Sequence, residues 1–262
     1  MNGRLVCMYS ALLALILVSC SDSGTSSADG DLSSSSGEVL SSSSAVSSSS
    51  SSIPSSSSVM PSSSSVTKDW FNAAISYGSL TDTRDNQTYK TVVIGAQTWM
   101  AENLNYTPSS GNSWCYNNLA SNCATYGRLY DWSTVMAGSV SSATSPSRVQ
   151  GICPSGWHVP SNAEWTVLTD YVDSSTAGTQ LKVNSSLWST NTGTDDYGFS
   201  ALPGGCYYGS GFGNVGYSGN WWSATAYSST GAYYWGMYYV YAYVYSIYFD
   251  KSYGFSLRCI KD

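Results

Sequence analysis

The stretch GICPSGWHVPSNAEWTVLTDYV, Gly151 to Val172, carries the clearest structural signal in the sequence. Ser161 is followed three residues later by Glu164, which is the spacing of a capping box, where each side chain accepts a hydrogen bond from the other residue's backbone amide. We therefore predict a helix from Asn162 to about Val172. Its apolar stripe consists of Trp165, Leu168 and Val172.

The same stretch contains two side chains that could do chemistry. Capping already explains Glu164, so we do not assign it as a catalytic acid. His158, which is the only histidine in the chain, lies in a loop just before the cap, with no obvious nucleophile to activate. We interpret it as a structural residue rather than a general base.

Three further segments have patterns that predict secondary structure. Thr88 to Tyr106 is typical of a β-hairpin, with Gly95-Ala96 as the turn and Trp99 on the returning strand. Tyr126 to Met136 predicts a short helix, because apolar residues recur at positions i, i+3 and i+7. The chain ends in alternating apolar positions, typical of a half-buried strand. These are Phe255, Leu257 and Cys259.

The segment Gly198 to Thr225 is rich in glycine and aromatic residues. It lacks the G-x-x-x-x-G-K-[ST] pattern, and no helical pattern follows it, so a phosphate-binding loop is excluded. We expect short strands joined by Gly-rich loops. The neighbouring Asp195-Asp196 pair is interpreted as a solvated acidic turn.

The charge of the sequence restricts which partners the protein can have. Of the 262 residues, 10% are charged and 14% are aromatic, and the formal net charge is −6. Charged residues usually make up about 25% of a soluble domain. Without a basic patch or stripe, we expect no nucleic-acid partner.

The N-terminus has the features of an export signal. Arg4 supplies positive charge and Ala11 to Val18 is apolar but too short to span a bilayer. Leu17 to Cys20, LVSC, resembles a bacterial lipobox, which implies a signal peptide over 1–19 and lipidation of Cys20. The alternative is an ordinary signal peptide with a chance cysteine. Lipidation implies membrane attachment in the bacterial envelope, and Ser21 favours the outer membrane under the lipoprotein sorting rule.

Residues 20–66 comprise the lipidated cysteine and a Ser-rich tether, and 67–262 a single domain. The tether has too few apolar residues to offset the entropy of ordering, so we expect disorder. The domain is long enough to bury a core.

Seven cysteines become five once Cys7 and Cys20 are assigned to the signal and the anchor. In an exported protein they favour disulfides, with one left over. The spacings match no zinc site, and the tripeptides that bind calcium in lectins are missing. We expect no metal and no cofactor.

Six motifs, in this order, resemble the Fibrobacter succinogenes major paralogous domain family. They are YKTVVIGAQTWMAENLNY, CYNN with YGRLYDW, CPSGWHVPSNAEW, GFSALPGG, WWSAT and KSYGFSLRCIKD, and they cover Leu80 to Asp262. The family is abundant on exported proteins, and its biochemical role is largely unassigned. The order of motifs is further similar to C-type-lectin-like and formylglycine-generating-enzyme-like domains.

The resemblance implies an α+β, C-type-lectin-like fold with two helices, short antiparallel strands and long Gly-rich loops. By the same analogy Cys153 bridges to Cys259, and Cys115 to Cys123. Cys206 is left over at a position where the family usually has another residue, which leaves the pairing scheme open.

The aromatic stretch Tyr233 to Phe249 becomes two neighbouring strands around a turn at Val240 to Val244 in the family pattern. In one interpretation alternate side chains pack the core, while the other tyrosines line a wet sheet face. The predicted core residues are Tyr233, Trp235, Met237, Val244, Ile247 and Phe249. In the other interpretation the tip of the turn is exposed and joins an aromatic ligand-binding platform. Its members are Tyr207, Tyr208, Trp221, Trp222, Tyr241 and Tyr243.

Three functions compete. The first, which we favour, is a non-catalytic surface module for adhesion that binds glycan or protein through aromatic-rich loops. The second is an enzyme, either of the formylglycine-generating type, for which Cys206 lacks the required partner in its loop, or a hydrolase using Glu164, Asp195 and Asp196. The third is a structural domain of a surface assembly.

Overall fold

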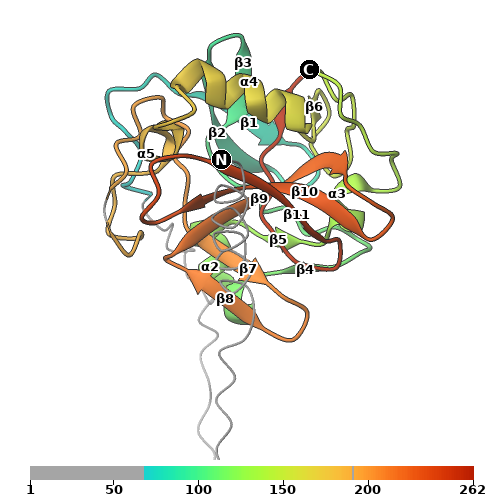
Figure 1. Cartoon of the computed structure of the whole chain (residues 1–262). Helices are drawn as coiled ribbons and strands as arrows, with labels where there is room; N and C mark the ends of the chain where they lie inside the picture. Colours follow the sequence, from blue (N-terminus) through green and yellow to red (C-terminus); the bar gives the residue numbers. More distant parts are fainter. Residues whose placement is uncertain (1–67, 191) are drawn as a thin grey trace, which may run out of the picture. The chain divides into compact units, whose positions relative to one another are not determined.

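The computed structural model describes residues 68–190 and 192–262 (Figure 1). The predicted signal peptide, Cys20 and the tether lie outside these residues. The described part mixes four α-helices with several small antiparallel sheets, which confirms the α+β class and adds two helices to the predicted pair. The helices are α2 (Ala120–Tyr126), α3 (Trp132–Met136), α4 (Asn162–Val172) and α5 (Ala177–Leu181), with a 3₁₀ turn η1 (Tyr116–Asn118).

The largest sheet has five strands in the order β1-β2-β3-β12-β6. Its strands are β1 (Gly78–Asp82), β2 (Gln87–Ile94), β3 (Gln97–Met100), β12 (Ile260–Lys261) and β6 (Trp157–His158). A three-stranded sheet has the order β11-β10-β9. It contains β9 (Ser218–Ala226), β10 (Gly231–Tyr238) and β11 (Tyr245–Asp250). Two hairpin-like pairs complete the set: β4 (Ser113–Trp114) with β5 (Leu129–Tyr130), and β7 (Gly204–Tyr207) with β8 (Phe212–Val215).

The hairpin β2–β3 is confirmed, with Ile94 paired to Gln97 across Gly95-Ala96. Gly95 has φ +61°, and an added Cβ would lie 2.9 Å from the Tyr171 ring. Both constraints select glycine, because other residues reach this backbone region only at a steric cost.

Helix α4 is confirmed at both ends and in its cap. The Ser161 Oγ accepts the Glu164 amide, while the Glu164 carboxylate accepts the Ser161 amide. The helix lies across the five-stranded sheet (Figure 1), and its predicted stripe is buried in a cluster with Trp99 and Trp235. Trp165 stacks on Trp235, with ring centroids 5.8 Å apart.

The predicted helix from Tyr126 to Met136 is wrong over its first half. Helix α2 ends at Tyr126, because Gly127 takes φ +76°, and the chain then forms β5 against β4. A new helix, α3, begins after Asp131, whose carboxylate accepts the Thr134 amide. Spacing alone could not reveal the intervening β5, since its partner lies about fifteen residues earlier.

The end of the chain closes the five-stranded sheet. Ile260 pairs with Trp99 on β3 and with His158 on β6. The predicted half-buried strand is corrected here: the residues from Phe255 to Ile260 are all buried, and only Ile260–Lys261 are strand. This segment runs between the two hydrophobic clusters of the fold, so side chains on both sides of it are covered.

Both expected disulfides are present. Cys153–Cys259 joins the loop before β6 to the last segment, across 106 residues, and Cys115–Cys123 ties η1 to α2 across eight. Cys206 is buried on β7 and belongs to neither bridge.

Strands β10 and β11 pair as expected, with Tyr233 opposite Tyr248. The single wet face is not observed on β10, because Tyr234 packs against Phe255 at 4.5 Å on one side while Trp235 and Met237 are buried on the other. Tyr233, predicted in the core, is only half-buried. No helix in the described residues is long and apolar enough to cross a membrane.

Candidate functional site

The two predicted ligand-binding tryptophans belong to the core. Trp221 and Trp222 are 0% exposed, since eight of the nine residues of β9 are buried. The indole N–H of Trp221 donates to Asn103 Oδ1 at 2.8 Å, and that of Trp222 to the Tyr130 carbonyl at 2.7 Å. Their assignment to a surface platform is therefore corrected, because neither ring can meet a ligand.

Tyr207 and Tyr208 lie in a separate aromatic group around β7 and β8. The Tyr207 ring stacks on Trp114 at 4.1 Å and meets Phe212 at 5.1 Å. Tyr208 is half-buried and packs against the hydrophobic cluster that contains Tyr130, Trp222 and Phe255. The aromatic neighbours of Tyr207 are thus Trp114 and Phe212, whereas Tyr241 and Tyr243 contact each other.

Tyr241 and Tyr243 lie in a chain of five tyrosine rings, which we call the tyrosine platform. Tyr241 stacks on Tyr243 with centroids 5.0 Å apart and planes 11° apart. The contacts continue from Tyr241 to Tyr238 at 5.3 Å, from Tyr238 to Tyr239 at 4.8 Å, and from Tyr239 to Tyr217 at 5.3 Å. Tyr217 is exposed and the others are half-buried.

Sequence reasoning missed three of these rings. Tyr238 and Tyr239 were assigned to a strand, and Tyr217 reaches the platform from the β8–β9 turn, more than twenty residues away. The run of tyrosines was a signal for the first two. Nothing local indicated Tyr217.

The turn that carries the platform is fastened by its backbone. The Lys182 ammonium donates to the carbonyls of Tyr238, Tyr239 and Tyr241, at 3.1, 3.3 and 3.0 Å. Lys182 is fully buried, and burial lowers its pKa to about 8. At neutral pH it remains mostly protonated and donates to all three carbonyls, while the Tyr239 carbonyl also accepts the hydroxyls of Thr190 and Thr192.

Helix α5 also contacts the backbone of this turn. The Thr179 amide donates to the Ala242 carbonyl at 2.9 Å. An added Cβ at Gly178 would lie 2.5 Å from the Tyr243 carbonyl, so this close approach requires glycine. The predicted exposed tip is thus docked through its main chain, while its rings remain at least partly exposed.

The three candidate carboxylates have different hydrogen-bond partners and different degrees of burial. Asp195, predicted to be solvated, is buried, and it accepts the amide and hydroxyl of Ser200 at 2.7 and 2.8 Å. Burial raises its pKa to about 6. Asp196 is exposed and accepts the Thr194 hydroxyl at 2.8 Å. Glu164 is buried at the start of α4.

His158 lies between two carboxylates. Its Nε2 lies 2.7 Å from Glu164 Oε1 and its Nδ1 lies 2.6 Å from Asp262 Oδ1. A shallow groove of about 450 Å³ runs past His158, Arg148 and Asp262. Because both ring nitrogens already face carboxylates, the imidazole has no nitrogen left to act on a substrate in this groove.

Arg258 is a buried charged residue that donates hydrogen bonds to two loops. It is fully buried, and burial lowers its pKa to about 9. Its guanidinium donates to Asn103 Oδ1 at 2.8 Å, to the Ser200 carbonyl at 2.7 Å, and to the Phe199 carbonyl. These contacts join the last segment of the chain to two loops.

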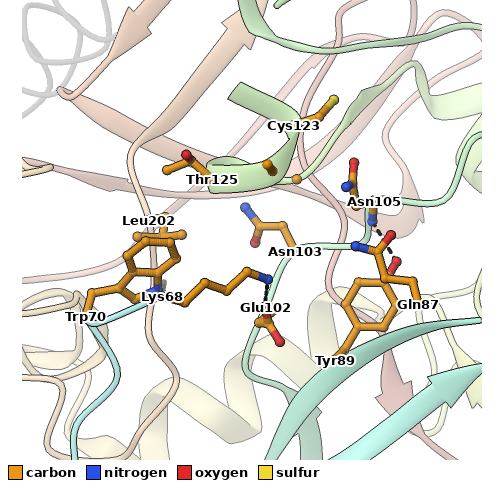
Figure 2. Close-up of a pocket in the computed structure, with 12 residues that line it drawn as sticks. Lys68, Trp70, Gln87, Tyr89, Glu102, Asn103, Asn105, Cys123, Thr125 and Leu202 are labelled. Atoms are coloured by element: carbon orange, nitrogen blue, oxygen red, sulfur yellow. Dashed lines mark hydrogen bonds and ion pairs between the residues drawn. The ribbon is translucent and has the colours of Figure 1, made fainter. Parts of the chain in front are cut away.

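Figure 2 shows a small cavity beside β2 and α2. The Lys68 ammonium pairs with Glu102 at its edge, and the Tyr89 hydroxyl accepts the Asn105 amide at 3.0 Å (Figure 2). The cavity has a volume of about 20 Å³, enough for a single water molecule. It is too small for a ligand. Residues 68–190 and 192–262 contain no group of three or more His, Cys, Asp or Glu side chains arranged for a metal ion.

Comparison with known proteins places the chain in a family. No curated protein and no solved structure matches it. The model of the Fibrobacter succinogenes major domain family matches residues 92–261, well over half of the chain. The matched region contains β3 and the end of β2, both disulfides, α4 and the whole tyrosine platform. The chain therefore belongs to the Fibrobacter succinogenes major domain family.

Proposed function

We propose that this protein is a non-catalytic adhesion module, lipid-anchored in the bacterial envelope through Cys20, that binds polysaccharide through the tyrosine platform. The observation that carries the proposal is the fastening of the platform by its backbone. Lys182 and Thr179 bind the carbonyls of Tyr238, Tyr241 and Ala242, which orders the turn, and we expect a partner to contact its rings.

Such a platform suits a sugar. A pyranose ring has an apolar face that stacks on an aromatic ring, and tyrosine adds a hydroxyl at the edge. A turn that is already ordered loses little conformational entropy on binding, which improves affinity. The low charge of the chain, 10% of residues, also suits a neutral partner.

The arrangement of potential catalytic groups supports a non-catalytic function. Glu164 is engaged by His158 and by the capping box, and Asp195 by Ser200. Enzymes of the formylglycine-generating type use a reactive cysteine pair, whereas Cys206 is fully buried on β7 and four other cysteines form the two bridges.

The order of elements supports a C-type-lectin-like fold as part of the proposal. A capped helix precedes a loop-rich middle, and the last strand, β12, returns into the five-stranded sheet between β3 and β6, where Cys153–Cys259 holds the chain end. In the same proposal the apolar segment and LVSC motif direct the chain to the envelope, with the outer membrane favoured, and the Ser-rich tether lifts the domain from the lipid.

Retention on insoluble polysaccharides tests the function. Residues 67–262 are incubated with cellulose, xylan and mannan, and bound protein is measured. The double change Tyr241→Ser and Tyr243→Ser removes the stacked pair at the centre of the platform. We expect binding to weaken about thirtyfold, because each of the two lost rings contributes roughly 1 kcal/mol of stacking.

Tyr171→Ser is the matched control, since Tyr171 is an exposed tyrosine on α4 whose ring lies against Gly95 and meets the edge of Tyr197. It should leave retention unchanged. Thermal melting of all variants checks that the fold is intact. Equal retention by the wild type and the double variant would remove the platform from the proposal, and no retention on any polysaccharide would favour the surface-assembly alternative.

A further inference from the structure

A second aromatic surface lies on the three-stranded sheet, beyond the reach of α4. The helix covers Trp235, whose indole donates to Asn162 Oδ1 at 2.9 Å, at the first residue of α4. The neighbouring cross-strand pair on β10 and β11 is Tyr233 and Tyr248. Tyr233 is only half-buried and Tyr248 is 44% exposed. The uncovered part of this sheet face therefore carries tyrosine in place of aliphatic side chains.

Tyr227, from the β9–β10 turn, completes this surface. Its ring stacks on Tyr248 with centroids 3.6 Å apart and planes 7° apart. Tyr233 stands perpendicular to both rings, at 5.7 and 6.3 Å. Since Tyr227 is 53% exposed, the pair presents aromatic surface to solvent although the two rings cover each other's inner faces.

A groove of about 320 Å³ borders the pair, which we call the Tyr227 groove. This volume lies at the small end of the range for ligand sites. Its polar groups are the hydroxyls of Ser228 and Thr230 and the carboxylate of Asp250. The Asp250 carboxylate accepts the Ser252 amide at 2.9 Å, and this contact keeps its pKa below the usual value.

The wall of the groove is ordered by hydrogen bonds. Gly231 closes the turn, since its amide donates to Ser228 Oγ at 2.9 Å and its carbonyl accepts the Tyr227 amide at 3.0 Å. The Lys251 ammonium donates to the carbonyls of Ser228 and Ser229 at 2.9 and 3.0 Å. A wall held in this way needs little reordering when a ligand enters.

The charges at the groove disfavour both kinds of ion. Asp250, the charged residue that lines the groove, repels an anionic ligand, and the ammonium of Lys251, next in the chain and held against the carbonyls of the turn, offsets the attraction of that carboxylate for a cation. What remains is a neutral ligand with an apolar face and several hydroxyls. A carboxylate accepts hydrogen bonds from such hydroxyls, and these charge-assisted bonds are stronger than neutral ones.

We propose that the Tyr227 groove binds a pyranose unit of a neutral polysaccharide, with the sugar stacked on the tyrosine pair and its hydroxyls donating to Asp250. The site shares no residue with the tyrosine platform. The two sites together would give one chain two points of attachment to a polymer, which raises avidity without any change in either site.

Binding of soluble oligosaccharides to the purified full chain tests this site. Neutral hexasaccharides of glucose, xylose and mannose are compared by calorimetry with an oligogalacturonate and a chitosan oligomer. We expect the tightest binding with a neutral hexasaccharide. Tyr227→Ser with Tyr248→Ser should weaken it at least tenfold. Asp250→Asn, an exposed change that leaves the turn intact, should weaken it several-fold.

Tyr171→Ser is the control on another exposed tyrosine and should have no effect, and melting curves confirm folding of each variant. The Tyr241→Ser, Tyr243→Ser variant should keep the part of oligosaccharide binding that Asp250→Asn reduces, which separates this site from the platform. Unchanged affinity in both groove variants would overturn the proposal. Tighter binding of galacturonate or chitosan, lost in Asp250→Asn, would also overturn it, since the groove would then recognise charge.

Discussion

At the scale of single residues, the described domain uses its few buried charges as braces for irregular backbone. Lys182 and Arg258 are both fully buried and donate mainly to carbonyls of loops. Asp195 accepts the amide of Ser200. In a domain with long loops, many carbonyls and amides have no strand or helix partner, and a buried charged side chain can satisfy several at once.

The pKa of His158 determines how the stability of the folded state should depend on pH near neutrality. Burial alone lowers its pKa, but the hydrogen bonds with Glu164 and Asp262 outweigh burial and raise the pKa above the ordinary value of 6.5. The folded state therefore holds the proton more tightly than the unfolded state. Its contribution to stability is full below pH 6.5 and is lost as pH rises through the folded pKa. We expect the urea midpoint to fall as pH rises above 6.5.

His158→Gln should flatten this part of the pH profile, because the titrating group is gone. Asp195, with a pKa raised from 3.8 to about 6, acts in a lower window. Its contribution to stability is full below about pH 4 and is lost as pH rises to about 6. Asp195→Asn should therefore leave the pH dependence above pH 6.5 unchanged. A midpoint that is equally pH-dependent in wild type and His158→Gln would contradict the assignment.

At the scale of elements, α4 depends on its cap. Ser161 is fully buried, accepts the Glu164 amide and also donates to the Thr144 carbonyl at 2.6 Å. We expect Ser161→Ala to lower the free energy of unfolding by about 1–2 kcal/mol, the upper part of the range for N-cap changes, as measured by urea denaturation. Thr166→Ala, on the exposed face of the same helix, should change it by less than about 0.5 kcal/mol.

Elements that depend on near neighbours were predictable. The β2–β3 hairpin follows from alternation and Gly95, and α4 follows from Ser161 and Glu164. The helix predicted from Tyr126 failed because β4 pairs with β5, a contact that no local pattern contains. The aromatic residues of the candidate sites were likewise only partly predictable. The run of tyrosines at the platform was visible, and Tyr248 was among the tyrosines expected on a wet sheet face, but Tyr217 and Tyr227 were missed because their exposure depends on distant segments.

At the scale of the whole molecule, the two disulfides should differ in importance. In the chain-entropy model a bridge stabilises in proportion to the logarithm of the loop that it closes. Replacing Cys153 and Cys259 by Ala opens a loop of 106 residues and should cost about 4–5 kcal/mol. Replacing Cys115 and Cys123 opens one of eight and should cost about 2–3 kcal/mol.

Guanidinium unfolding of the two double variants measures the difference. The first variant should also release β12 from its place between β3 and β6, since the bridge lies one residue before Ile260. Hydrogen exchange at Ile260 reports on that release. Equal losses of stability in the two variants would argue against the entropic account.

The sequence by itself determined the family, the hairpin, the capped helix and, through the family resemblance, the two disulfides, because these follow from short motifs and local spacing. Only the tertiary structure decided which aromatic rings meet solvent. Trp221 and Trp222 are covered from both sides, whereas Tyr227 and Tyr248 lie where α4 leaves the sheet open. Exposure depends on what distant segments place above a side chain, and residue type and spacing along the chain do not contain that information.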